Sequence, residues 1–410
     1  MKNIIMQKKE NYFLNYIYLY VFLMPWNFFN GQMGVLSGIL LIWWLVIGKK
    51  NLYFSKLKNI IKFKPLLLLI VFFMYAYLSL LWTSNLEASN DSLKFYKYYW
   101  VIIPVFFTVL DREKVEKLFY VLISSFGFYS LFSIFIYLGY IEIPFNSVGN
   151  PRGILAYAIV TPYMALGFLS SLILAYYSQH KKFKILFLLI AFFCFIGLFI
   201  NDGRAGQLAF FCTLAILVFL YRKKLFNLKF FFIFLIILSL SIFAWSYFGK
   251  LDKFQAGVND FKNMEEQHFA GSWGQRAYMW YAAAYILKKE PIFGTGVGDN
   301  IDEFIVYTKE HPSKATWLRS FHNQHLDILT RYGIVGYLLF MSSIVLLLNS
   351  LRENKYFFSL GIVFFSITLI NGLADIILLM KPYNNVFMLI FILLSVVAYD
   401  KKNRLICNEK

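Results

Sequence analysis

Residues 322–350 read HNQHLDILTRYGIVGYLLFMSSIVLLLNS, a polar segment that runs directly into a long apolar one. The apolar part, 332–350, is long enough to cross a lipid bilayer as an α-helix. His322 lies just ahead of it, at the bilayer edge, where an ionisable group is costly and usually has a function. Because imidazole accepts a proton near neutral pH, this stretch predicts a membrane helix with a titratable group at its mouth.

Apolar runs of this kind recur along the whole chain of 410 residues. Hydrophobic residues make up 60% of the sequence, aromatic residues 21% and charged residues only 15%. This composition is typical of an all-α polytopic membrane protein and excludes an ordinary soluble domain. We expect twelve transmembrane helices, at about 13–29, 31–48, 65–83, 97–110, 117–139, 154–177, 185–201, 205–221, 230–247, 332–350, 356–372 and 383–399.

Lys and Arg lie between these spans and indicate the orientation of the chain. With the N-terminus inside, seven inner segments hold 25 of the 40 Lys and Arg residues, as the positive-inside rule requires. Both termini are then cytoplasmic. The net charge of +18 therefore reflects membrane topology rather than nucleic-acid binding. The basic start, 1–10, has no small-residue cleavage site after it, so we expect an uncleaved first span.

One outer connection, about 248–321, is too long to be a simple link. It divides the chain into spans one to nine (1–247), an outer loop domain (248–321), and spans ten to twelve with an inner tail (322–410). Within the loop we expect two helices, at 272–290 with Ser272 as N-cap and at 299–309. A glycine-rich turn, 294–298, joins them.

Three basic or titratable side chains fall at the outer face in this topology. Arg204 lies in the short link after the seventh span, Arg276 opens the first loop helix, and His322 precedes the tenth span. Two guanidinium groups suit a diphosphate, because Arg binds phosphate oxygens in pairs. Backbone N–H groups of the glycine turn would add donors to the same anion. Each residue also has a structural interpretation: Arg204 as a lipid anchor, Arg276 as a solvated helix residue, and His322 as a helix cap.

Two groups of side chains offer alternatives for a metal site. His325 lies three residues after His322, but no carboxylate or Cys completes a ligand set at suitable spacing. Asp299, Asp302 and Glu303 stand together at the start of a predicted helix, where the helix dipole favours acids. We therefore expect neither a metal nor a cofactor.

His322-Asn323, then nine residues, then Gly333-Ile334-Val335-Gly336 resembles the signature of the O-antigen ligase and polymerase superfamily. The segments around Arg276 and at 290–296 resemble the part of that family ahead of the signature. Arg204 corresponds to an Arg that follows the family's seventh span. The resemblance covers most of the chain in order and topology, and about 200–340 closely. Gly203 departs from the family, whose members often carry Ser there.

The resemblance implies a GT-C-like, metal-independent glycosyltransferase of the bacterial inner membrane, with a periplasmic active site. It implies an undecaprenyl-diphosphate-linked glycan as donor, the lipid A core as acceptor, membrane lipids as surroundings, and no nucleic acid. It implies His322 as the base, with Arg204 and Arg276 as ligands of the diphosphate. We expect the remaining substrate-binding residues to be Asn323, His325, Gly294, Gly296, Arg319 and Asp375.

Two other functions stay open. A polysaccharide polymerase would use the same donor chemistry, although the family's polymerase pattern of Arg, ten residues, then Gly is not met here: Arg276 leads to Leu287, and Arg204 to Ala215. A transporter or flippase for an anionic lipid or solute should show repeats, broken helices and ionisable residues near the bilayer midplane. The sequence groups its ionisable residues at the outer surface instead, which favours the enzyme.

Overall fold

The structure, a computed structural model, describes residues 2–144, 150–225, 228–247, 255–256, 258–260, 262, 269–316 and 320–408. These residues form helices without any strand, so the prediction of an all-α polytopic membrane protein is confirmed. Each predicted span corresponds to one helix: α1 (Lys2–Leu23), α2 (Gln32–Gly48), α3 (Lys64–Leu78), α5 (Tyr99–Val109), α6 (Arg112–Tyr137), α7 (Tyr157–Tyr177), α8 (Lys181–Ile200), α9 (Arg204–Leu220), α11 (Leu228–Tyr247), α15 (Gln324–Leu351), α16 (Lys355–Asn371) and α17 (Lys381–Asn408).

Not all of these helices are equally suited to cross a bilayer. Among the described residues, six are long and apolar enough, and five more are apolar but shorter, α5 and α9 among them. The first predicted span, 13–29, is wrong in its bounds, because α1 begins at Lys2 and ends at Leu23. Pro25 follows within two residues, and the residue before a proline disfavours helical backbone.

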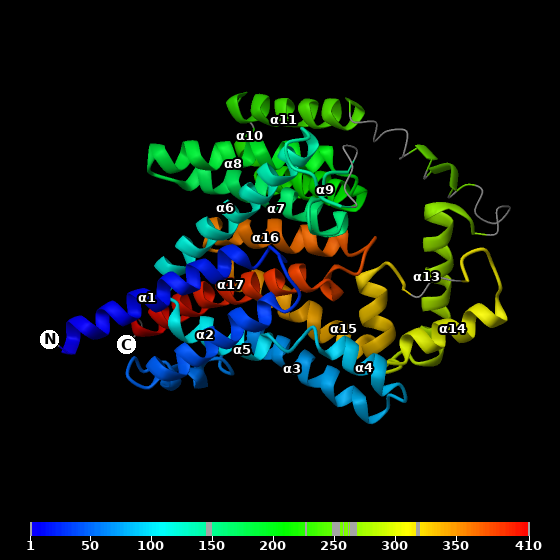
Figure 1. Cartoon of the computed structure of the whole chain (residues 1–410), viewed down its shortest axis with the longest axis horizontal. Helices are drawn as coiled ribbons and strands as arrows, with labels where there is room; N and C mark the ends of the chain where they lie inside the picture. The colour runs from blue at the N-terminus through cyan, green and yellow to red at the C-terminus, as the bar shows by residue number, and fades with distance from the viewer. Residues whose placement is uncertain are drawn as a thin grey trace.

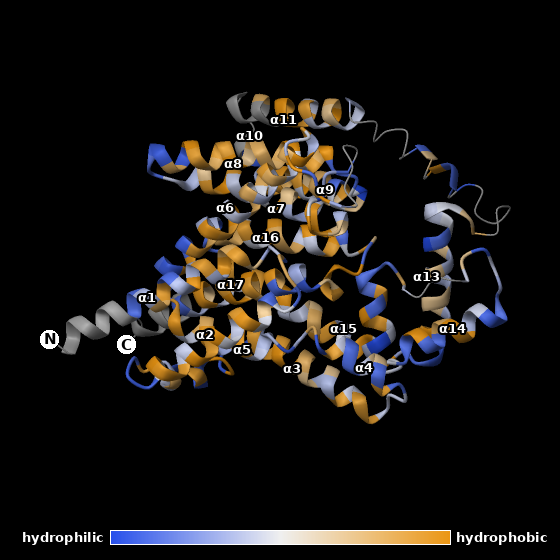
Figure 2. Cartoon of the chain, viewed as in Figure 1, coloured by the Kyte–Doolittle hydropathy of each residue, from blue (hydrophilic) through white to orange (hydrophobic). Residues whose placement is uncertain are grey.

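The helices lie side by side in one bundle, with both ends of the chain at the left of Figure 1. Helices α4 (Leu86–Leu93), α13 (Gly271–Lys289) and α14 (Asn300–Glu310) lie at the opposite end. Figure 2 shows apolar residues along the bundle and hydrophilic ones gathered near its two ends. Helices α7 and α17 form its centre, since 94% of an apolar 18-residue stretch in each is buried. We call the end that carries α13 and α14 the outer end.

Helices α13 and α14 pack on each other around a small apolar core of their own. Tyr278 and Ile286 from α13 meet Phe304 and Tyr307 from α14. The prediction that Ser272 caps the first loop helix is wrong, because the helix begins one residue earlier and Ala270 holds the cap position without a side-chain bond. Side-chain packing therefore holds α13 against α14 in the outer loop.

Helix α15 is broken at Gly333, and the break anchors the outer loop. Gly333 has φ 60° and ψ −168°, which only glycine adopts readily. The break opens the two helical bonds that would join Ile334 to Thr330 and Val335 to Arg331. All four groups find partners in the segment 291–296. The N–H groups of Thr295 and Gly296 donate to the carbonyls of residues 330 and 331 over 2.9 and 3.0 Å. The N–H groups of residues 334 and 335 donate to the carbonyls of Pro291 and Ile292 over 3.0 and 3.3 Å.

We call these four bonds the backbone clasp. It is reinforced by a buried ion pair, in which Arg331 Nε lies 3.1 Å from both carboxylate oxygens of Asp327. Arg331 also donates to the Val297 carbonyl and, over 2.8 Å, to Ser92 Oγ of α4. Asn300 Nδ2 donates to Asp327 over 3.3 Å. The start of α15, the glycine turn, α4 and α14 are thereby fixed to one another.

Replacing Gly333 by Ala should destabilise the protein. The added Cβ would collide with the backbone carbonyl of Ile292, and the backbone conformation itself costs a non-glycine residue on the order of 1–3 kcal/mol. We expect a lower unfolding temperature in detergent, measured by size-exclusion chromatography after heating. Gly38→Ala is the matched control, because nothing lies within 4 Å of its Cβ position. Equal stability of the two variants would show that the clasp contributes nothing.

The orientation predicted from the basic segments can be tested by cysteine labelling. Lys314 lies in the outer loop and Lys182 at the opposite end of the bundle, and both are exposed. In a background with Cys194, Cys212 and Cys407 changed to Ala, Lys314→Cys should react with an impermeant maleimide added outside intact cells, whereas Lys182→Cys should react only after permeabilisation. The reverse pattern would invert the topology.

Candidate functional site

His322 lies at the outer end of the bundle, immediately before α15, and does not cap that helix. The cap is Asn323, whose Oδ1 accepts hydrogen bonds from the N–H groups of His325 and Leu326 over 3.0 and 3.2 Å. His322 itself has a positive φ of 42°, which is uncommon for a residue with a Cβ. Asn323 therefore performs the capping, and the His322 imidazole is left for another role.

The imidazole is paired with Asp375, from the connection between α16 and α17. His322 Nδ1 lies 3.1 Å from Asp375 Oδ1. The carboxylate is nearly buried, with 9% of its side chain exposed, whereas 42% of the histidine side chain is exposed. A carboxylate at Nδ1 holds the proton on that nitrogen and leaves Nε2 as the basic atom. No described residue bonds Nε2.

Gln324 brings these two segments together, although they are 53 residues apart in the chain. Its backbone N–H donates to the carbonyl of Gly372 over 2.6 Å. Its side-chain Oε1 accepts from the N–H of Leu378 over 2.8 Å. The first residue of α15 thus holds both ends of the connection that carries Asp375, and this fixes the His–Asp pair.

Arg276 lies on the first turns of α13 and faces the same centre. Its Nη1 donates to Ser272 Oγ over 2.8 Å and to the Ser272 carbonyl over 3.3 Å. Its Nε is buried without a partner among the described residues. Burial lowers the pKa of Arg276, the negative charge of Asp375 opposes this, and the positive charge of Arg204 adds to it. The two arginines and Asp375 therefore lie close enough to act on one another.

Arg204 is the first residue of α9, half-buried at the outer end. The preceding Gly203, where family members often carry Ser, packs directly on Thr161 of α7. A Cβ at this position would collide with the Thr161 hydroxyl and methyl, so the chain needs glycine here. The position that departs from the family pattern is thus accounted for by a neighbouring threonine.

The glycine turn uses its donors within the protein. Thr295 and Gly296 N–H groups belong to the clasp, and Val297 N–H donates to Ser79 Oγ over 3.1 Å. A Cβ at Gly294 would collide with the backbone of Arg331 and Gly333. These three N–H groups are therefore not free to bind an anion, and the turn serves to join the outer loop to α15.

His325 lies apart from the exposed imidazole and has both ring nitrogens engaged. Nε2 lies 2.9 Å from the carbonyl of Leu369 in α16, and Nδ1 lies 3.0 Å from the hydroxyl of Tyr337. A carbonyl only accepts, so Nε2 carries the proton and the ring links α15 to α16. Of the predicted binding residues, Arg319 lies outside the described residues.

The acidic residues of the loop have protein partners. Asp299 accepts from the N–H groups of Ser84 and Asn85, each over 2.8 Å. Asp302 accepts from Asn85 Nδ2 over 2.7 Å, and Glu303 pairs with Lys289 over 3.2 Å. Within the described part of the chain, no three His, Cys, Asp or Glu side chains are grouped so that they could hold a metal ion.

The structure thus gathers Arg204, Arg276, His322 and Asp375 at one place on the outer end. The sequence predicts the first three residues as a group, whereas it places Asp375 only among the binding residues. The pairing of Asp375 with His322 has no local signal, because it depends on how the α16–α17 connection folds over the start of α15. Its place in the last outer connection was the only hint that the sequence offered.

Comparison with known proteins supports the resemblance seen in the sequence. Residues 189–341 match the family model described as O-antigen ligase, and the matched segment contains Arg204, Arg276 and His322. A relative from Haemophilus influenzae, described as an uncharacterized protein, is 28% identical over 179 residues. That alignment covers 40% of this chain and 44% of the relative, so the chain spans less than half of the relative's length. Over residues 189–341, the chain is therefore similar to the O-antigen ligase family.

Proposed function

We propose that this protein transfers a glycan from undecaprenyl diphosphate to the lipid A core oligosaccharide at the periplasmic face of the inner membrane. The observation that carries the proposal is the His322–Asp375 pair, whose Nε2 atom no described residue bonds, together with the positive charge of Arg276 near Asp375. A base next to a concentrated positive charge suits the attack of a hydroxyl on a sugar whose leaving group is an anion.

The geometry supports a single displacement. His322 Nε2 takes the proton from the acceptor hydroxyl, and that oxygen forms a bond to the anomeric carbon. The bond from the same carbon to the diphosphate oxygen breaks, and the electron pair leaves with undecaprenyl diphosphate. Attack opposite to the leaving group inverts the anomeric centre. Asp375 keeps Nδ1 protonated and stabilises the imidazolium that forms.

Arg276 is suited to the diphosphate because part of its guanidinium group is already held. Ser272 fixes Nη1, while Nε is buried without a partner. An unpaired buried donor is costly, and phosphate oxygens would satisfy it. Arg204 adds a second positive charge from the first turn of α9, where the helix dipole also favours an anion. The donor carries its own leaving group, the diphosphate, and the two arginines stabilise its charge. The proposed reaction therefore needs no metal ion.

The same machinery suits a polymerase that adds the glycan to a second lipid-linked glycan. A deletion strain separates the two. If the protein is a ligase, lipopolysaccharide gels lose the capped bands while lipid-linked polymer accumulates. If it is a polymerase, the polymer itself is lost. The transporter alternative has less support, because the four backbone groups that the break in α15 opens are bonded to the segment 291–296.

Replacing His322 by Asn should abolish most of the transfer without unfolding the protein. Asn keeps a polar side chain but cannot accept the proton, and general base catalysis is typically worth about 10²–10⁴ in rate. Asp375→Asn should also lower kcat, by roughly 10²-fold or more, because it no longer selects the tautomer. The measurement is the amount of core-linked glycan per unit of enzyme in membranes. Excess chelator is present throughout, and we expect that it does not change the wild-type rate.

The matched control is His311→Asn, which changes an exposed histidine of the outer loop. It should transfer at the wild-type rate. If His322→Asn were as active as this control, or if its defect followed a loss of thermal stability, the catalytic assignment would be wrong. His325→Ala should instead lower thermal stability, since it removes a link between α15 and α16.

Replacing Arg204 or Arg276 by Ala should weaken binding of the diphosphate in both the ground state and the transition state. Truncating one partner of a charged pair costs on the order of 2–5 kcal/mol, so we expect a higher KM for the donor together with a lower kcat. Arg276→Lys should recover little, because an ammonium group cannot bond Ser272 and two phosphate oxygens in one plane. Lys288→Ala, on the same helix but near its far end, is the control. Normal kinetics in both Ala variants would leave the arginines as lipid anchors.

A further inference from the structure

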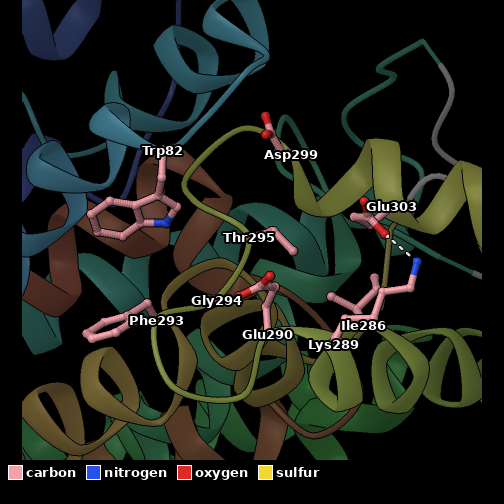
Figure 3. A pocket seen from close by; sticks show the side chains of 9 residues that line it. All are labelled: Trp82, Ile286, Lys289, Glu290, Phe293, Gly294, Thr295, Asp299 and Glu303. Carbon is pink, nitrogen blue, oxygen red and sulfur yellow. Dashed lines mark hydrogen bonds and ion pairs between the residues drawn. The ribbon is translucent and has the colours of Figure 1, made fainter.

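A cavity of about 610 Å³ opens at the C-terminal end of α13. It lies between the last turn of α13, the glycine turn, the start of α14 and Trp82, which follows α3 (Figure 3). Its volume is in the range of small-molecule sites. None of the four residues of the proposed catalytic centre lines it. The cavity is therefore a separate feature of the outer end.

One wall is aromatic and only partly used by the protein's own packing. The rings of Trp82 and Phe293 meet at 62° with centroids 6.5 Å apart, so that they form a corner (Figure 3). Tyr75 braces this wall, because its ring lies 5.8 Å from Trp82 and its hydroxyl donates to the Phe293 carbonyl over 3.2 Å. The Phe293 side chain is nevertheless 57% exposed. A braced but exposed aromatic ring is suited to a flat apolar face of a ligand.

The opposite wall is polar and carries a net negative charge. Asp299 is fixed by the backbone of residues 84 and 85, and Glu303 by Lys289. Glu290 is exposed and has no partner among the described residues. Three carboxylates against one ammonium group give a formal charge of −2 for the lining. Such a wall accepts hydrogen bonds from hydroxyl groups and repels phosphate and other anions.

The indole N–H of Trp82 adds a donor to this set. Its nitrogen is buried and has no hydrogen-bond partner among the described residues. In Figure 3 the nitrogen edge of the ring faces the side on which Thr295 lies. A buried donor without an acceptor is costly, and an oxygen of a bound ligand is one way to supply the missing acceptor.

We propose that this cavity binds an uncharged sugar ring of a glycan substrate, at a distance from the reacting sugar. A sugar ring presents C–H groups on one face and hydroxyl groups around its edge, which matches an aromatic corner opposite carboxylates. A diphosphate would be repelled by the negative lining, and a lipid chain would offer no hydrogen-bond donor to the exposed carboxylate of Glu290. The proposal takes its ligand, a glycan, from the proposed function, but the cavity itself does not depend on the catalytic assignment.

The length of α13 decides what this site contributes. Arg276 and Glu290 are 14 residues apart, which is about 21 Å along a helix axis. One monosaccharide cannot span that length, so the bound ring lies several units from the bond that is made or broken. Interactions with it are equal in the ground state and the transition state, and they should therefore affect KM rather than kcat.

The first test reads binding without transfer. Two soluble probes are prepared by mild acid: the glycan released from the lipid-linked donor, and the core oligosaccharide released from lipid A, both from the source strain lacking this gene. Saturation-transfer difference NMR with the purified full-length protein should show ring-proton signals for one of them. The signals should fall about tenfold in Phe293→Ala and Trp82→Ala, as the loss of one aromatic contact predicts, and persist in Arg276→Ala. Absence of signal with both probes would overturn the proposal.

The second test uses transfer in vesicles with the intact donor and acceptor. Phe293→Ala and Glu290→Gln should raise KM about tenfold for one substrate at unchanged kcat, and the substrate affected identifies whether the ring belongs to the donor or the acceptor. The controls are Trp100→Ala and Glu87→Gln, which alter a Trp and a Glu outside this cavity. Unchanged KM values for both substrates would overturn the proposal. Loss of kcat in His322→Asn is measured alongside, so that failure of the proposed function is seen separately.

Discussion

The arrangement of the outer end depends on a break in one helix. At Gly333 two helical hydrogen bonds of α15 are opened, and the four groups that lose their partners bond instead to the segment 291–296. Buried or membrane-embedded backbone groups without partners would each cost about 1–3 kcal/mol or more, so the segment and the break are obligatory partners. Helix α13 ends just before this segment, and α14 begins shortly after it. The clasp therefore fixes the position of the outer loop relative to the bundle.

The clasp also explains how residues distant in sequence form one centre. His322 is placed by the start of α15, Asp375 by the bonds that Gln324 makes to the following connection, and Arg276 by α13. Arg204 comes from a fourth element, α9. Each residue lies on a helix or next to one, and hydrogen bonds tie the connections to those helices, so the charges have fixed positions without a substrate. Such preorganisation is what gives electrostatic groups their effect on a transition state.

Much of this could be predicted from the sequence, since hydropathy, basic loops and proline positions act locally. All twelve apolar runs became helices, and the two loop helices lie within two residues of their expected bounds. The errors at the candidate site concern groups whose hydrogen-bond partners the local sequence does not reveal. Ser272 was predicted to be a helix cap, yet it accepts a hydrogen bond from Arg276. The glycine turn was predicted to bind an anion, yet two of its N–H groups bond α15 and a third bonds Ser79. No local pattern tells whether a backbone donor faces a ligand or a broken helix.

The two halves of the signature therefore have different physical roles. His322 provides the exposed imidazole that we propose as the base, Asn323 caps the helix, and Gly333 permits the break that anchors the loop. The nine residues between Asn323 and Gly333 form a helical segment of about 13.5 Å. This segment is stiffened by the Asp327–Arg331 ion pair, which also contacts the glycine turn and α4. Its length fixes the separation of the His322 imidazole from the clasp, and through α13 it fixes the imidazole relative to Arg276. The proposed chemistry therefore depends on the nine-residue spacing between Asn323 and Gly333 in this chain.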